Sequence, residues 1–109
     1  MFEVIYTPQA EKQLRKAVFD IYDASKDYQT AVNYIEGIKN SLDEIKKNPK
    51  LASLTNYQKW RKQGVRKIHF RHYYAYFLID EPVNVMRVIA VVYDGMDQET
   101  FLEKNVKCL

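Results

Sequence analysis

The sequence contains a single cysteine, Cys108, next to the C-terminus. One thiol forms no internal disulfide and no cysteine-based zinc site, so we expect stability to come from packing alone. The chain also lacks any run of about 18 consecutive apolar residues, and its first six residues, MFEVIY, do not resemble a signal peptide. We therefore expect a cytoplasmic protein with no membrane partner, no metal site and no cofactor.

Low-complexity segments and internal repeats are also missing. Hydrophobic residues make up 47% of the chain, aromatic residues 14% and charged residues 28%, which is typical of neither a disordered nor a fibrous protein. A length of 109 residues suits one compact domain and leaves no room for a second. The sequence predicts a single domain spanning residues 1–109.

Acidic residues are absent between Glu44 and Asp80, whereas the same stretch holds nine lysines and arginines. The rest of the chain has eight basic and fourteen acidic residues, so residues 45–79, here called the basic block, carry a formal charge of +9 against −6 elsewhere. A net charge of +3 conceals this division. The basic block favours a polyanionic partner, either nucleic acid or an acidic protein surface.

Apolar periodicity predicts a strand over residues 2–6 and then two helices that form a hairpin. Thr7 and Pro8 have the pattern of an N-cap and a first helical residue. The first helix is expected from Gln9 to about Ala24. Residues 25–27 interrupt the apolar pattern, and a second helix is expected after them, ending near Asn48-Pro49. We interpret Gly37, inside the second helix, as a tolerated weakness rather than a site of close packing.

Residues 50–64 show no clean period, although four large apolar residues spaced by three are predicted to anchor short turns on the core: Leu51, Leu54, Tyr57 and Trp60. Beyond them, residues rich in β-branched and aromatic types predict strands over 65–71, 74–80 and 84–93. Turn signals at 71–73 and 81–84 join these strands into an antiparallel meander. Asp97 is expected to cap a final helical turn, and the last few residues are expected to fray.

The predicted fold class is α+β, with the order β-α-α-β-β-β and a short C-terminal helix. Both helices must cover one face of a twisted, mainly antiparallel sheet, and we expect the other face to stay open. If Ile68 and Phe70 point toward the helices, strand alternation places Lys67, His69 and Arg71 on the open face.

Five fragments, in this order and spacing, resemble the RelE/ParE family of type II toxin–antitoxin toxins, which includes plasmid stabilization proteins. The resemblance covers residues 2–102 and rests on Tyr6–Ala10, the hairpin closing at Asn48-Pro49, Gly64–Phe70, Tyr74–Asp80 and Val88–Asp97. It implies a toxin that inhibits growth and is neutralised by a small cognate acidic antitoxin wrapped over its surface.

The family divides into two mechanisms, and the resemblance leaves both open. RelE-like members cleave mRNA in the ribosomal A site, whereas ParE-like members inhibit DNA gyrase. Metal-free RNA cleavage needs a proton acceptor, a proton donor and cations near the phosphate. The catalytic candidates are Arg66, Lys67, His69 and Arg71, with His72 as a further imidazole.

The region after the last predicted strand departs from the RelE-like pattern, because Asp94, Asp97 and Phe101 stand where an arginine-containing turn and a tyrosine are usual. Two carboxylates repel RNA phosphate, and phenylalanine has no hydroxyl to transfer a proton. A non-enzymatic inhibitor is therefore an equal alternative. A third alternative is an inactive, toxin-derived module that binds nucleic acid or has a regulatory role.

Further residues are candidates for binding nucleic acid or a protein partner: Lys59, Arg61, Lys62, His72, Tyr73, Tyr93, Asp94 and Asp97. Tyr57 and Trp60, interleaved with the first three, have the pattern of a base-stacking surface, but packing onto the core is the favoured interpretation. The simplest role for Asp94 and Asp97 is capping. The oligomeric state is not predicted.

Overall fold

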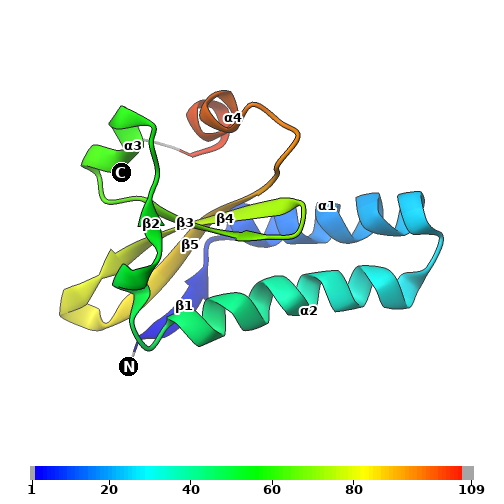
Figure 1. Cartoon of the computed structure of the whole chain (residues 1–109), viewed down its shortest axis with the longest axis horizontal. Helices are drawn as coiled ribbons and strands as arrows, with labels where there is room; N and C mark the ends of the chain where they lie inside the picture. Colours follow the sequence, from blue (N-terminus) through cyan, green and yellow to red (C-terminus); the bar gives the residue numbers. More distant parts are fainter. Residues whose placement is uncertain (1, 107–109) are drawn as a thin grey trace.

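A computed structural model describes residues 2–106, so Cys108 and the predicted fraying of the terminus lie outside the described residues (Figure 1). Its elements are β1 (Glu3–Tyr6), α1 (Pro8–Ser25), α2 (Tyr28–Ile45), β2 (Ser53–Leu54), α3 (Gln58–Lys62), β3 (Arg66–Phe70), β4 (Tyr73–Asp80), β5 (Val85–Tyr93) and α4 (Gln98–Asn105). Within these residues, no helix is both long and apolar enough to span a membrane.

The sheet has five strands in the order β1-β5-β4-β3-β2. β1 runs parallel to β5, and the other neighbouring strands are antiparallel, which confirms a mainly antiparallel sheet. The hairpin of α1 and α2 carries the chain from the edge strand β1 to the opposite edge at β2. The last strand, β5, then returns beside the first.

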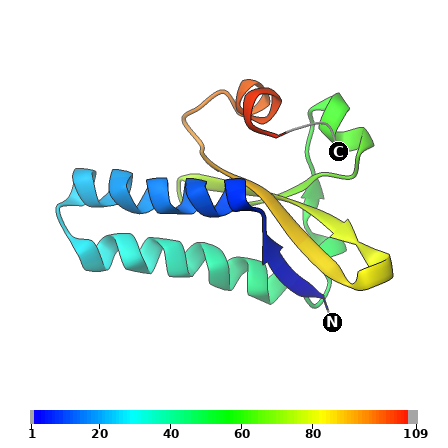
Figure 2. The ribbon, with the colours of Figure 1, turned by 180° about the vertical axis from the view of Figure 1, so that it is seen from behind.

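The hairpin begins and turns where the sequence predicts. Thr7 Oγ1 accepts a hydrogen bond from the Ala10 backbone N–H at 3.1 Å, and Pro8 is the first residue of α1. Lys26, at φ 57°, ends α1 in the left-handed conformation, and the Asp27 carboxylate caps α2 by accepting from the Gln29 N–H. Figure 2 shows the hairpin extending well beyond the sheet at its free end.

Two cores lie on opposite faces of the sheet. Under the hairpin, apolar side chains of α1 and α2 pack against β4 and β5, including Leu14, Ile38, Leu42, Phe77 and Val88. On the face predicted to be open, α3 and α4 cover a second cluster that includes Trp60, Val65, Tyr76, Ile89 and Leu102. The prediction of an open face is therefore wrong for this part of the sheet. The nearly continuous apolar run VMRVIAVVY of β5 matches this arrangement, because the strand is covered on both of its faces.

Two further expectations are corrected by the packing. A Cβ built on Gly37 would overlap the Phe70 ring, with Phe70 Cε2 at 2.7 Å, so the glycine marks close packing between α2 and β3 rather than tolerated weakness. Leu51 does not anchor the core, because a short 3-10 turn over Pro49–Leu51 ends with its side chain 76% exposed. Trp60, by contrast, is fully buried, which confirms packing over base stacking.

Candidate functional site

The sheet surface beside β3 carries Lys67 and His69, as strand alternation predicts, since Ile68 and Phe70 pack under the hairpin. The His69 ring stacks on Tyr74 of β4 at 4.4 Å between centroids, and the Lys67 ammonium lies 5.1 Å from the centroid of the same ring. One tyrosine therefore holds an imidazole and a cation side by side on this surface.

Arg71 does not join them, and its predicted place on that surface is wrong. β3 ends at Phe70, and Arg71 occupies the following turn with φ 53°, so the alternation of the strand no longer applies. Its guanidinium lies 5.3 Å from the ring centroid of Tyr34 on α2 and 5.4 Å from that of Phe70. Arg71 thus lies on the hairpin side of the sheet.

Arg66 is occupied by the backbone of its neighbouring segment. It shares the alternation phase of Ile68, and its Nη1 donates to the carbonyl oxygens of Lys50 at 3.2 Å and Ala52 at 2.6 Å. These bonds hold the chain ahead of β2 against the edge of β3. In this structure the side chain of Arg66 therefore fixes the local backbone at this edge of the sheet.

The acidic turn after β5 contacts both histidines. Asp94 Oδ2 lies 3.0 Å from His69 Nε2 and 4.0 Å from His72 Nδ1, and the Asp94 backbone N–H donates to the His72 carbonyl at 2.7 Å. Asp97 caps α4, as predicted, and the Thr100 backbone N–H that it accepts lowers the pKa of this carboxyl. The carboxylate of Asp94 is the one that meets the basic surface.

Gln98 fixes this turn, and sequence reasoning missed it. It is 8% exposed, its Nε2 donates to the carbonyls of Tyr93 and Met96, and its Oε1 accepts from the Tyr76 hydroxyl at 2.8 Å. Burial raises the pKa of Tyr76, so that hydroxyl remains a donor. A glutamine directly after an N-cap residue gave no signal that it would turn inward.

The three basic candidates on α3 lie apart from β3. Lys59 pairs with Glu103 of α4 at 3.0 Å, and Arg61 donates to the Thr55 carbonyl at 3.3 Å. Lys62 is exposed at the end of the short helix. The cations of α3 thus lie away from the histidines, whereas Lys67 lies beside His69 and Arg71 lies against Tyr34 on the hairpin side.

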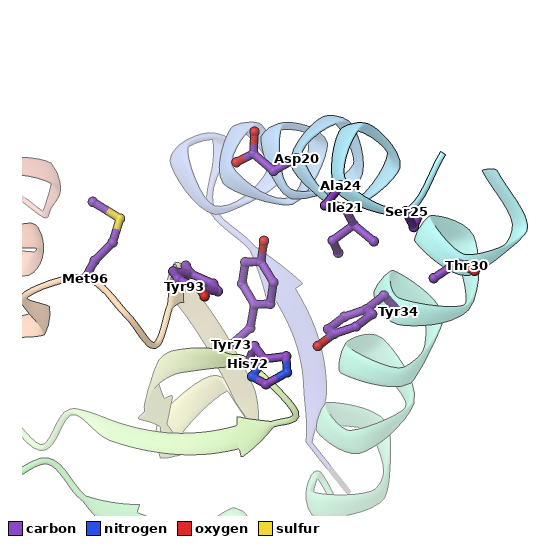
Figure 3. A pocket seen from close by; sticks show the side chains of 10 residues that line it. All are labelled: Asp20, Ile21, Ala24, Ser25, Thr30, Tyr34, His72, Tyr73, Tyr93 and Met96. Atoms are coloured by element: carbon purple, nitrogen blue, oxygen red, sulfur yellow. The ribbon is translucent and has the colours of Figure 1, made fainter. Parts of the chain in front are cut away.

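A groove opens where the free end of the hairpin overhangs the β3–β4 turn (Figure 3). We call it the aromatic groove; it has a volume of about 620 Å³, and its walls include Asp20, Ile21, Tyr34, Tyr73, Tyr93 and Met96. The Tyr73 ring meets Tyr34 and Tyr93 edge-on at 5.9 and 5.7 Å. Burial, with Asp20 as the next cause, raises the pKa of Tyr73 to about 12. Tyr73 and Tyr93 were candidates from the sequence, whereas Tyr34, inside the second helix, was not among them.

These arrangements differ in the chemistry that they allow. Within residues 2–106, no three His, Cys, Asp or Glu side chains come together as a metal-binding group. His69 beside Asp94 has the components of a proton-transfer pair. The aromatic groove offers apolar surface, ring faces and one carboxylate, which suits binding of another molecule.

The comparisons with known proteins agree with this architecture. A family model described as the ParE toxin of the type II toxin–antitoxin system parDE matches residues 4–98. Escherichia coli RelE, solved in the free state as a double arginine-to-alanine mutant, is 21% identical, with 97% of this chain and 98% of RelE covered and a TM-score of 0.62. No individual curated protein matches the chain in sequence.

A second similar structure is that of the intact E. coli RelBE toxin–antitoxin complex, in which the matching chain is 18% identical. The similarity covers 85% of this chain and 96% of that one, with a TM-score of 0.54. At these identities the two structures show a common fold. Together with the family model, which spans most of the sequence, they confirm the resemblance: the chain belongs to the RelE/ParE family of type II toxin–antitoxin toxins.

Proposed function

We propose that this chain inhibits growth by binding a protein target, with DNA gyrase as the first target to test. We also propose that a cognate acidic antitoxin neutralises it in the cytoplasm by covering the basic block. Family membership supports a toxin with an antitoxin partner. The charge of +9 between Ile45 and Ile79 supports an acidic one.

The observation that carries binding over RNA cleavage is the dispersal of the candidate cations. Arg66 donates to two backbone carbonyls, and Arg71 lies over Tyr34 on the hairpin side. Metal-free cleavage requires cations that converge on the developing charge of the phosphorane. Lys67 is left beside His69, and there Asp94 opposes the approach of a phosphate.

One observation favours mRNA cleavage as the second candidate. The His69 imidazole, 46% exposed, lies 3.0 Å from the Asp94 carboxylate and stacks on Tyr74. A carboxylate that orients an imidazole makes it a competent general base. RNA binding on this surface would use Lys67 as the phosphate contact.

One experiment separates the candidates: induction of the protein without its antitoxin, followed by growth, ribosome-bound mRNA and DNA breaks. The binding proposal expects growth arrest with DNA breaks and intact mRNA. It also expects His69→Ala and Lys67→Ala to remain toxic, like Lys12→Ala, which changes an exposed cation on α1 outside the basic block.

Cleaved mRNA that becomes intact with His69→Ala would establish the nuclease candidate in its place. Unimpaired growth in the presence of folded, soluble protein would contradict both candidates and leave the inactive, toxin-derived module. Circular dichroism of each purified variant provides the control for folding.

A further inference from the structure

The aromatic groove is large and open enough to receive part of another protein. Its volume of about 620 Å³ lies within the range of roughly 300–1,000 Å³ found for ligand pockets. Figure 3 shows Tyr73 and Tyr34 directed into the space between α1 and α2, with Tyr93 and Met96 on the opposite wall. Tyr93 and Met96 are 49% and 50% exposed, so these apolar surfaces are available to a partner.

The chemistry of the groove favours a cation. Tyr34 and Tyr93 line the groove with their rings, and Tyr73 forms its floor at 8% exposure. Asp20 supplies a carboxylate, and among the described lining residues His72 is the one basic side chain, with no lysine or arginine. Tyrosine ring faces attract ammonium and guanidinium groups. The chain already uses Tyr34 in this way, because the Arg71 guanidinium lies 5.3 Å from its centroid.

The location of the groove argues against an acidic occupant. Figure 1 shows α3, which carries part of the basic block, at the opposite end of the long axis from the free end of the hairpin. An acidic antitoxin held by the cations of α3 therefore binds away from the groove, and Arg71 is the cation of the basic block that lies beside it, over Tyr34. The groove, with Asp20 at its rim, suits a partner segment of the opposite sign.

We propose that the aromatic groove is the surface that binds the toxin's protein target, through a lysine or arginine side chain of that target. The stem of this side chain lies along Tyr73 and Tyr93, and its charge reaches Asp20. The inference rests on the proposed function, because it requires a toxin that acts by binding.

Lys16 is the cation that the target must displace, because its ammonium lies 2.9 Å from the Asp20 carboxylate. Both side chains of this pair are more than half exposed, at 75% and 55%. Exposed pairs one helical turn apart contribute little to stability. Exchange of Lys16 for an arginine supported by aromatic rings is therefore favourable.

The chain offers two matched controls for a test in cells. Asp23, on the same helix, pairs with Lys26 at 3.1 Å but does not line the groove, and Tyr22 is 44% exposed outside it. We expect Asp20→Asn and Tyr93→Ala to reduce toxicity by about tenfold in inducer dose, and antitoxin affinity to change by less than about threefold. Asp23→Asn and Tyr22→Ala should remain as toxic as the wild type. Thermal melting of all four variants verifies folding.

Undiminished toxicity of both groove variants would overturn the proposal. An equal loss of antitoxin affinity would also overturn it, because the groove would then be the antitoxin's site. If the wild type arrests no growth, the proposed function fails instead, and that result is distinct from a failure confined to the groove variants.

A peptide titration tests the chemistry of the groove without reference to toxicity. The probe is acetyl-Leu-Arg-Leu-amide, and its matched control carries citrulline, which has the shape of arginine without its charge. We expect the arginine peptide to shift the NMR signals of the Tyr73 and Tyr93 rings, and citrulline to bind about tenfold more weakly. In Asp20→Asn this preference should shrink. Equal affinity of the two peptides would overturn the inference. So would the absence of any shift in the tyrosine signals at about 10 mM arginine peptide, because a Kd above that concentration means a binding free energy weaker than about 3 kcal/mol.

Discussion

The contact between Gly37 and Phe70 yields a prediction whose sign distinguishes packing from helix propensity. In an exposed helix interior, replacing glycine by alanine stabilises a protein by about 1 kcal/mol. At Gly37 the new methyl group would overlap the Phe70 ring, with Cε2 at 2.7 Å and Cε1 at 3.0 Å. Carbon atoms pack at about 3.5–4.0 Å, so the ring must move.

The Phe70 ring has little freedom to move. It meets Tyr34 edge-on at 6.0 Å between centroids, and the Arg71 guanidinium lies 5.4 Å from its centroid. Insertion of a methyl group into such packing costs about 1–3 kcal/mol. After the gain in helix propensity is subtracted, Gly37→Ala should lower the free energy of unfolding by about 1 kcal/mol.

Urea unfolding of Gly37→Ala in two backgrounds measures this effect. In the wild-type background we expect destabilisation, whereas with Phe70→Ala, where the ring is gone, the same change should stabilise by about 1 kcal/mol. A stabilising Gly37→Ala in the wild-type chain would refute the packing account. Equal effects in the two backgrounds would refute it as well, since the two residues would then be uncoupled.

Three other predictions concern stability. Burial raises the pKa of Tyr73, so its contribution to stability is complete below pH 10 and is lost as the pH rises toward 12. Between pH 9 and 12, the free energy of unfolding of the wild type in urea should fall by about 2–3 kcal/mol more than that of Tyr73→Phe. An equal fall in the two proteins would contradict this. Arg66→Met removes the donors to Lys50 and Ala52 and should cost about 1–2 kcal/mol in urea unfolding, unlike Lys67→Met on the opposite face. Thr7→Ala removes the cap of α1 and should lower the unfolding free energy by about 1 kcal/mol, whereas Thr7→Ser should not.

The hairpin was predictable because independent signals coincide in one stretch of sequence. Thr7 and Pro8 mark the start of α1, apolar residues recur at three- and four-residue spacing, and Asn48-Pro49 stops the second stripe. Strands β3 to β5 were predictable for a similar reason, since turn residues separate runs of β-branched and aromatic residues. The other boundaries lie within about two residues of their predicted positions, the usual disagreement at element ends, but α2 ends at Ile45, three residues before Asn48.

The bounds and types of β2 and α3 were not predictable, because neither has enough residues to show a period, although the anchoring of a short turn by Trp60 was predicted and is confirmed. β2 is two residues long and exists because Arg66 holds the preceding chain against β3. α3 is five residues long and exists because Trp60 fills the second core. In both, tertiary contacts impose the local structure. The second core itself had a signal, since β5 is too continuously apolar for a strand with one solvated face.

The candidate site was predictable residue by residue but not as an arrangement. The alternation of β3 correctly placed Lys67 and His69, but its extension by one residue misplaced Arg71, because the strand ends at Phe70. The aromatic groove brings together Asp20, Tyr34, Tyr73 and Tyr93 from four separate elements or their ends. No local pattern in the sequence reports such a meeting.

The β3–β4 turn connects the two surfaces, and this affects how variants there are interpreted. His72 lines the aromatic groove, and its Nδ1 also lies 4.0 Å from Asp94, which in turn pairs with His69. A loss of toxicity in His72→Ala therefore has two possible sources, a damaged groove or a damaged histidine pair. His69 does not line the groove, so His69→Ala affects the second source alone. A toxic His69→Ala beside a non-toxic His72→Ala would place the activity in the groove.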